Sequence, residues 1–547
     1  MSSTIQKQLE EVEKNIIQGN FLYCFEIIEK NIKQKNISKE DQYKFLALKT
    51  FILNQYGEYQ EALEITEKVF TDKTVKENLE LYLDILNENV LSLAFLGKIQ
   101  EALTKFDIID EILTNSKIKE KVIYKQKALF NRAKWWFHFT LGDREKFIHH
   151  AHEFNNYSIK YGNKFHIATS YNILAFIYSD DVPNLELCKE YLDSSYEIIK
   201  EIGNKFELTR YHLWYGVYCF AKYEYNLALE SFQKGIDLAL ENKYNLQLPI
   251  LYLYKGAIHR RLLELDKALD LTTKSLKFPT TISWQIYPTS SIGYIYHLKG
   301  ELSLALDYYK KSLKKCQEIN EKRHRSYLLT NIVELCLELD DTEKANEYLN
   351  ELDEFNKTIQ NDITYEHFTL AKALVLKASN QIRDLSKAAD LLEELLKQEE
   401  IRNPLEITFN LITINLKELQ LSPNEVNLGK VNNQINNLQE MAERQHYTFL
   451  RIEIFQLKSQ LALIESDAEK ALEYLMTAKT LASEKGSTLQ VENIVLEIEQ
   501  LNKQLDMWKQ LQAKSSPLTE TIKQITLDKT INRISKETII EERDENT

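Results

Sequence analysis

The chain has 547 residues, of which 13 are glycine and 7 are proline, too few to form the many turns of a β-rich or α/β protein. Its formal net charge of −13 repels a phosphate backbone, which excludes non-specific nucleic-acid binding. There is no apolar run of about 18 residues, and Met1 to Val12 is polar and charged, so neither a membrane segment nor a signal peptide is expected. The five cysteines are isolated in the sequence, which favours a reducing cytoplasm.

Small or apolar residues recur along the whole chain, each following a helix-turn signal. The intervals run from 37 to 45 residues, and most are 40 or 41. The twelve markers are Cys24, Ala62, Ala102, Phe147, Cys188, Ala228, Ala268, Ala305, Ala345, Ala388, Val431 and Ala471. A fixed period of this size indicates one helix-turn-helix unit stacked on itself. The sequence therefore predicts a solenoid, which can extend over 547 residues without domain boundaries.

The clearest unit runs from Ser290 to Asn320. Its apolar positions recur every three or four residues on both sides of Gly300, which predicts two amphipathic helices that meet at this glycine. Gly300 suits the left-handed conformation that ends a helix. Gly293 and Ala305 are small, as two helices in close contact require.

This pattern resembles the tetratricopeptide repeat, because Gly293, Tyr296, Gly300, Leu302 and Ala305 match that repeat's small, aromatic, glycine, apolar and alanine positions. The family's usual unit has about 34 residues, whereas these units have about 40, which implies longer helices or turns. The chain is similar to prokaryotic proteins built almost wholly of such repeats. The resemblance implies an all-α, right-handed superhelical solenoid of about twelve repeats, spanning residues 3–486, that acts in protein interaction.

The end of the chain departs from the repeat. Residues 487–514 are predicted to form one helix whose apolar stripe comprises Ile494, Ile498, Leu501, Leu505 and Trp508. An open solenoid exposes the apolar face of its last unit, so this helix is interpreted as a cap on a monomer. A short coiled coil that joins two chains is the alternative. Residues 515–547 are expected to be a weakly helical or mobile tail.

No catalytic or cofactor motif is found. The phosphate-binding, dinucleotide, nucleophile-elbow, zinc-protease and paired-cysteine patterns are all missing from the sequence, so the chain is predicted not to be an enzyme and to carry no cofactor or metal. The remote alternative is a metal site or enzyme centred on His149, His150 and His152, because His149 shares a helix face with Glu145 and Glu153. Solvated histidines on a polar face are the favoured interpretation.

The first helix of each unit in a tetratricopeptide array lines a concave groove. Aligning the repeats assigns to this groove Arg132, Trp136, Phe139, Asn172, Phe176, Arg210, Arg260, Arg261, Tyr287, Tyr294 and His297. Arginine pairs with carboxylates and aromatic rings supply large contact areas, so an acidic or amphipathic peptide, helix or protein is the expected partner. In the alternative interpretation, these arginines pair with neighbouring glutamates and the rings are packed. The residue set that grips a chaperone tail in this family is missing.

Two functions remain from these observations. The first is a non-catalytic scaffold that holds a peptide, helix or protein in its concave groove. The second is a ligand-responsive or peptide-responsive regulator of the same family, in which a ligand tightens the superhelix and changes the hold on a second protein. The sequence has no attached output domain, which disfavours the second.

Overall fold

The computed structural model describes residues 2–34, 37–115, 119–141, 143–181, 184–222, 224–262, 264–278, 282–319, 321–379, 381–398, 401, 404–444, 448–484 and 488–513. All elements in these ranges are helical. None of the described helices is long and apolar enough to span a membrane. The predicted tail, residues 515–547, lies outside the described residues.

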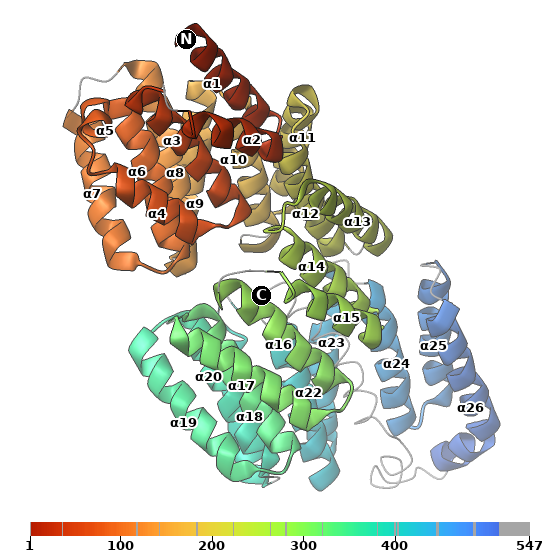
Figure 1. Cartoon of the computed structure of the whole chain (residues 1–547). Coiled ribbons are helices and arrows are strands. Elements are labelled where there is room, and N and C mark those ends of the chain that lie inside the picture. The colour runs from red at the N-terminus through yellow and green to blue at the C-terminus, as the bar shows by residue number, and fades with distance from the viewer. Residues whose placement is uncertain are drawn as a thin grey trace. The chain divides into compact units, whose positions relative to one another are not determined.

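Antiparallel helix pairs follow one another along the chain (Figure 1). The first seven pairs are α1 (Ser2–Ile17) with α2 (Phe21–Ile32), α3 (Lys39–Tyr56) with α4 (Tyr59–Val69), α6 (Leu79–Phe95) with α7 (Ile99–Asn115), α8 (Glu120–Leu141) with α9 (Arg144–Tyr161), α10 (Lys164–Phe176) with α11 (Leu185–Ile202), α12 (Lys205–Ala221) with α13 (Tyr225–Asn242), and α14 (Leu248–Arg261) with α15 (Leu265–Ser275). Two short elements are inserted, α5 (Lys73–Glu77) and the π-helical turn η1 (Ile177–Asp181).

Five further pairs and one long helix complete the described chain. They are α16 (Ile282–Leu298) with α17 (Leu302–Glu318), α18 (Arg323–Glu338) with α19 (Thr342–Ile359), α20 (Asp362–Ala378) with α21 (Ile382–Leu395), α22 (Pro404–Leu421) with α23 (Glu425–Arg444), α24 (Thr448–Ile464) with α25 (Ala468–Glu484), and finally α26 (Thr488–Ala513). The chain divides into two units, residues 1–325 and residues 326–547.

The repeat markers occupy equivalent places in the structure. All twelve lie on the second helix of a pair, and each is at most 1% exposed. A larger side chain at such a position would push the paired helices apart, which explains why most of the markers are small, Phe147 being the exception. The structure confirms the predicted solenoid of about twelve helix-turn-helix repeats over the described residues.

Local geometry in the clearest unit also agrees with the prediction. Gly300 has a φ of 76°, the left-handed conformation that ends α16. A Cβ atom added to Gly293 would lie 2.9 Å from Cδ1 of Tyr309 on α17. The two helices are therefore too close for any side chain at position 293. Gly293 thus allows the two helices to approach closely, and Gly300 allows the chain to reverse between them, both within a single repeat.

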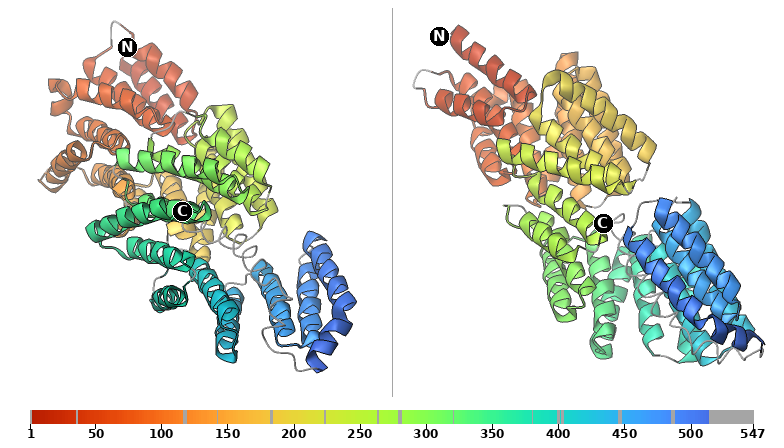
Figure 2. Two further views of the ribbon diagram at one scale, coloured as in Figure 1. Left: turned by 90° about the horizontal axis from the view of Figure 1, so that it is seen from below. Right: turned by 90° about the vertical axis from the view of Figure 1, so that its right-hand side faces the viewer.

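The long helix α26 packs on the last repeat. Ile494, Leu501 and Trp508 are buried in one apolar cluster with residues of α25 such as Ala471 and Ala478. Figure 2 shows α24, α25 and α26, in blue, side by side. The described members of the apolar stripe, Ile494, Ile498, Leu501 and Trp508, thus pack on the last repeat, and the capping role of residues 487–514 stays a prediction.

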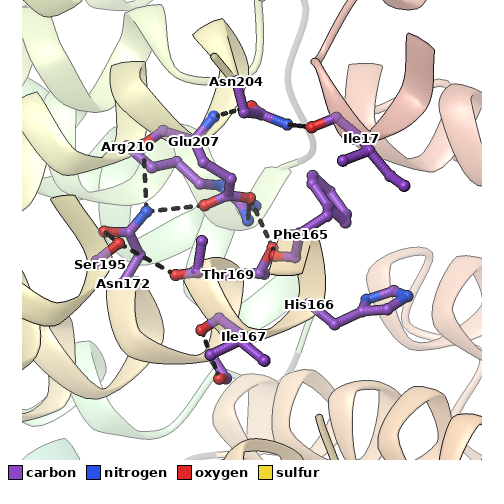
Figure 3. Close-up of polar contacts among 12 residues, drawn as sticks. Ile17, Phe165, His166, Ile167, Thr169, Asn172, Ser195, Asn204, Glu207 and Arg210 are labelled. Atoms are coloured by element: carbon purple, nitrogen blue, oxygen red, sulfur yellow. Dashed lines mark hydrogen bonds and ion pairs between the residues drawn. The ribbon is translucent and has the colours of Figure 1, made fainter. Parts of the chain in front are cut away.

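The first unit contains a contact between repeats that are far apart in sequence, which we call the closing contact. The Asn204 side chain donates a hydrogen bond from Nδ2 to the Ile17 carbonyl at 2.8 Å, as Figure 3 shows, and the Tyr244 hydroxyl donates to the Gly19 carbonyl at 2.7 Å. Phe21 packs on Phe206 with ring centroids 5.0 Å apart. The first repeat therefore contacts the sixth repeat and the turn that follows it.

Candidate functional site

Arg132 from α8 is buried inside the first unit. Its guanidinium forms an ion pair with Glu88 on α6, and the two side chains are 5% and 4% exposed. Glu88 also accepts a hydrogen bond from Asn54 Nδ2 on α3, at 2.9 Å. The guanidinium lies 5.2 Å from the centroid of the Phe51 ring. One side chain from each of three successive repeats thus meets at this carboxylate.

A second carboxylate, Glu207 on α12, organises the next two repeats (Figure 3). It accepts hydrogen bonds from Thr169 Oγ1 and Asn172 Nδ2, both at 2.8 Å, and it pairs with Arg210 at 3.3 Å. Ser195 completes the network by donating to Asn172 Oδ1 at 2.9 Å. Asn172 is fully buried, and its hydrogen bond to Glu207 joins α10 to α12.

These pairs change the expected electrostatic character of the groove. Arg132 and Arg210 each face a glutamate within the first unit, as in the alternative interpretation of the sequence. The physical reason is that a guanidinium removed from water needs a carboxylate close by. The two arginines therefore add no net positive charge to this part of the molecule.

The other predicted cations and rings gather on α14 and α16. Arg260 is buried, donates from Nη1 to Ser291 Oγ at 2.8 Å, and lies 5.2 Å from the Tyr294 ring centroid. Arg261 lies 4.0 Å from the Phe220 ring centroid. The Tyr294 and His297 rings are 6.4 Å apart, and Tyr287 lies 4.8 Å from His324. The contacts join Arg260, Tyr294 and His297, whereas Arg261 and Tyr287 contact rings on other helices, Phe220 on α12 and His324 on α18.

Aromatic rings form a continuous row across consecutive repeats, which we call the aromatic seam. Its members are Tyr59, Phe95, Trp136, Phe139, Phe176 and Trp214. Successive ring centroids are 4.2, 4.8, 5.8, 5.6 and 4.6 Å apart. Aromatic pairs at these distances attract one another beyond their area of burial. The seam joins the repeats from α4 to α12 and includes three of the predicted site residues.

Part of the seam is accessible from solvent. Phe95, Trp136, Phe139 and Trp214 are half-buried, whereas Tyr59 and Phe176 are buried. A half-buried ring is fixed by its neighbours and still offers one surface to another molecule. The four half-buried rings are therefore the best candidates for contact with a partner.

Sequence reasoning did not assign Tyr59, Phe95 or Trp214 to the site, although a signal for Trp214 was present. In three successive first helices, a polar inner residue is followed four positions later by an aromatic one: Arg132 by Trp136, Asn172 by Phe176, and Arg210 by Trp214. Residues four apart lie on the same face of a helix. A search for this pair at the repeat period would have identified Trp214 in addition to Trp136 and Phe176, which together are half of the seam.

The histidines proposed as a remote metal site make other contacts. Nδ1 of His150 lies 2.8 Å from Asn131 Oδ1, and Nε2 of His152 lies 3.0 Å from the Tyr178 hydroxyl. Burial lowers the pKa of His150 to about 3. Across the described ranges, no three His, Cys, Asp or Glu side chains come together as metal ligands.

His166, next to the Glu207 network, makes the first unit sensitive to acid. Its side chain is 8% exposed, and burial, aided by Arg132 and Lys125, lowers its pKa from 6.5 to about 3. Below about pH 6.5 the His166 imidazole therefore becomes protonated in the unfolded chain but stays neutral in the folded chain. The free energy of unfolding falls as pH falls, because the unfolded chain binds the additional proton. When the pH is lowered from about 7 to about 5, we expect this protonation to lower the free energy of unfolding by about 2 kcal/mol.

The measurement is urea unfolding at both pH values for the natural chain and for His166→Gln. The variant removes one titrating group and leaves the carboxylates, so the difference between the two pH dependences isolates His166. Equal pH dependence in both proteins would contradict this account.

Comparison with known proteins identifies solved structures that have a similar fold. No protein-family model matches the chain, and no curated protein matches it. Among solved structures it is similar to a Rap protein complexed with Competence and Sporulation Factor, with a TM-score of 0.50, 12% identity, and coverage of 67% of this chain and 99% of that one. It also matches a signal transduction ATPase with a tetratricopeptide repeat sensor from Pyrococcus horikoshii, with a TM-score of 0.40, 16% identity, and coverage of 62% and 53%.

A third match is yeast Tom70, with a TM-score of 0.36, 10% identity, and coverage of 92% of this chain and 97% of that one. Identities this low support conclusions about the fold alone. The helix pairs, the buried small-residue markers and the similarity to Rap agree with one another. The chain therefore has the helical-repeat fold of tetratricopeptide-like proteins.

Proposed function

We propose that this protein is a non-catalytic interaction scaffold that binds a protein or peptide along the aromatic seam of its first unit. The observation that carries the proposal is the row of half-buried rings, Phe95, Trp136, Phe139 and Trp214, across consecutive repeats. Rigid aromatic side chains lose little conformational entropy on binding and dominate the energetics of many interfaces.

The charge pairing inside the unit refines the expected partner. Because Arg132 and Arg210 are paired with Glu88 and Glu207, a partner gains little by presenting carboxylates to them. An amphipathic helix that lays an apolar face on the rings suits the seam better than a purely acidic peptide. We therefore favour the amphipathic partner of the two that the sequence suggested.

A second candidate function is a regulator that responds to a peptide. It is favoured by the similarity to the Rap protein, whose structure contains Competence and Sporulation Factor. In such a regulator, the ligand would bind one conformation more tightly and so shift the population toward it. This function and the scaffold share the seam and differ in whether the unit changes conformation on binding.

Replacing Trp136 with alanine tests the seam. Trp136 contacts the rings of Phe95, Trp135 and Phe139 and is half-buried, so the change removes an exposed anchor from the middle of the row. We expect the affinity for a partner captured from cell extract to fall at least about tenfold, or about 1.4 kcal/mol. The measurement is quantitative mass spectrometry of proteins retained by the natural chain and by the variant.

Tyr157→Ala is the matched control. Tyr157 is a half-buried aromatic residue of α9 that stacks on Tyr124 with centroids 6.4 Å apart. It packs on the same apolar cluster as Trp136, but its ring contacts no ring of the seam. Its replacement should leave the captured partner unchanged. Equal loss in both variants would indicate general destabilisation, and equal retention would place the binding surface elsewhere. Changed hydrogen exchange in distant repeats on binding would favour the regulator.

A further inference from the structure

A second aromatic surface lies on α10, α11 and α12, and we call it the tyrosine belt. Its members are Tyr171, Tyr191, Tyr196, Tyr211, Tyr215 and Tyr218. None of them belongs to the aromatic seam. Tyr196 is 39% exposed, and the other five are half-buried. The ring contacts form two groups, Tyr171 with Tyr191, and Tyr196 with Tyr211, Tyr215 and Tyr218.

The rings of the belt are held in fixed positions. The Tyr196 and Tyr211 centroids are 4.8 Å apart across two repeats, and Tyr211 stacks on Tyr215 at 5.6 Å. Tyr171 stacks on Tyr191 at 5.9 Å. Tyr191, Tyr211, Tyr215 and Tyr218 also pack on the buried cluster of Ala175, Cys188 and Leu192. The belt is therefore preorganised, with one side of its rings supported from within.

Four of the six hydroxyl groups are unused within the described part of the chain, whereas Tyr215 has Cys219 and Tyr218 has Lys222 as a hydrogen-bond partner. No other described residue forms a hydrogen bond with the hydroxyls of Tyr171, Tyr191, Tyr196 or Tyr211. Burial raises the pKa of Tyr191, so this hydroxyl stays protonated and can donate. Rings that are supported below and carry available hydroxyl groups suit a ligand with both apolar faces and hydrogen-bond acceptors.

An acidic stripe on α11 borders the belt. Glu186, Glu190, Asp193 and Glu197 follow one another at intervals of four, three and four residues, so they share one face of the helix, and all four are exposed. Asp193 pairs with Lys189. Within the described part of the chain, the other three form no ion pair. Burial raises the pKa of Tyr191 and of Tyr211, and the nearby charges of Glu190 and Asp193, respectively, add to this rise.

We propose that the tyrosine belt binds an extended, proline-rich segment that carries basic residues. A polyproline II helix has no internal hydrogen bonds, so its carbonyl groups are free to accept from tyrosine hydroxyls. Proline rings pack against aromatic faces, and the preformed helix loses little entropy on binding. The acidic stripe selects lysine or arginine in the segment over acidic residues. No belt tyrosine is a seam ring, although Trp214 of the seam packs on the same buried cluster as the belt. The proposal does not depend on the function proposed for the seam.

The first test measures binding to defined peptides. The full-length chain is titrated against a fluorescent peptide of repeating Pro-Pro-Arg triplets, and fluorescence anisotropy is recorded. Pro-Pro-Glu peptides test the role of charge, and Gly-Gly-Arg peptides, which keep the charge without the polyproline helix, test the role of conformation. We expect saturable binding of the first peptide and at least about tenfold weaker binding of the other two. Equal binding of Pro-Pro-Arg and Gly-Gly-Arg, or no saturable binding at all, would overturn the proposal.

The second test locates the peptide on the belt. Tyr211→Ala should weaken Pro-Pro-Arg binding at least about tenfold, and Tyr211→Phe should weaken it less, because it removes only the hydroxyl group. If Tyr211→Ala does not fold, Tyr196→Ala provides the same test at the most exposed ring. Tyr296→Ala is the matched control, since Tyr296 stacks on Tyr308 at 5.5 Å in another repeat.

Two outcomes of the second test are decisive. Unchanged peptide affinity in both Tyr211→Ala and Tyr196→Ala would refute the assignment. A loss of affinity in Tyr296→Ala as large as that in the belt variants would also refute it. The seam variant Trp136→Ala should bind the peptide normally, so failure of the belt and failure of the seam can be distinguished.

Discussion

Replacing Glu88 with alanine is expected to lower the unfolding free energy of the first unit by about 3–5 kcal/mol, because it leaves a buried guanidinium without a counter-charge. Arg132 is 5% exposed on its side chain and cannot move its charge into water without disrupting the packing around α8. Asn54 loses the same carboxylate as a hydrogen-bond acceptor. The effect should appear as faster amide hydrogen exchange in α3, α6 and α8, where these three residues lie.

Two comparison variants distinguish the effect of leaving a buried charge unpaired from the effect of losing an ion-pair contact. Glu201→Ala breaks an ion pair with Lys164 whose side chains are 58% and 48% exposed, and it should cost at most about 1 kcal/mol. Combining Glu88→Leu with Arg132→Met removes both buried charges and should recover most of the stability. A loss for Glu88→Ala no larger than that for Glu201→Ala would show that Arg132 does not depend on Glu88.

The repeat could be predicted from sequence because its determinants are local. Gly293 faces Tyr309 only 16 positions later, and Gly300 reverses the chain between the two helices that carry them. A small or apolar marker recurs in every unit, so an error in one unit is corrected by its neighbours. Helix pairing and the buried register of all twelve markers follow from contacts within one repeat.

The candidate site was only partly predictable, because its contacts join different repeats. Trp136, Phe139 and Phe176, which the aligned register assigned to the groove, are joined by ring contacts, and their role in binding stays a prediction. It did not indicate that Glu88, 44 positions before Arg132, supplies the counter-charge, because acidic residues are abundant and the register alone does not select one. Nor does any local pattern predict the closing contact, whose partners Ile17 and Asn204 are 187 positions apart.

Replacing Gly19 with valine is expected to open the closing contact. Gly19 has a φ of 78°, and an added Cβ would lie 3.0 Å from both Asn204 Oδ1 and the backbone nitrogen of Phe206. The change adds left-handed strain and displaces the hydrogen bonds that Asn204 and Tyr244 donate to this turn. Together these effects should cost about 2–4 kcal/mol. We expect faster amide exchange at both ends of the contact, in residues 2–32 and in residues 204–244.

Gly97→Val is the control that distinguishes left-handed backbone strain from loss of the closing contact. Gly97 has a φ of 71°, but an added Cβ would meet nothing within 4 Å, so this variant carries the backbone strain alone. Its faster exchange should stay within its own repeat, because each repeat of a solenoid depends mainly on its neighbours. Only Gly19→Val should also loosen α12 and α13, which lie five repeats further along the chain. If exchange in α12 and α13 is unchanged in Gly19→Val, the first repeat does not stabilise the sixth, and the closing contact has no energetic role.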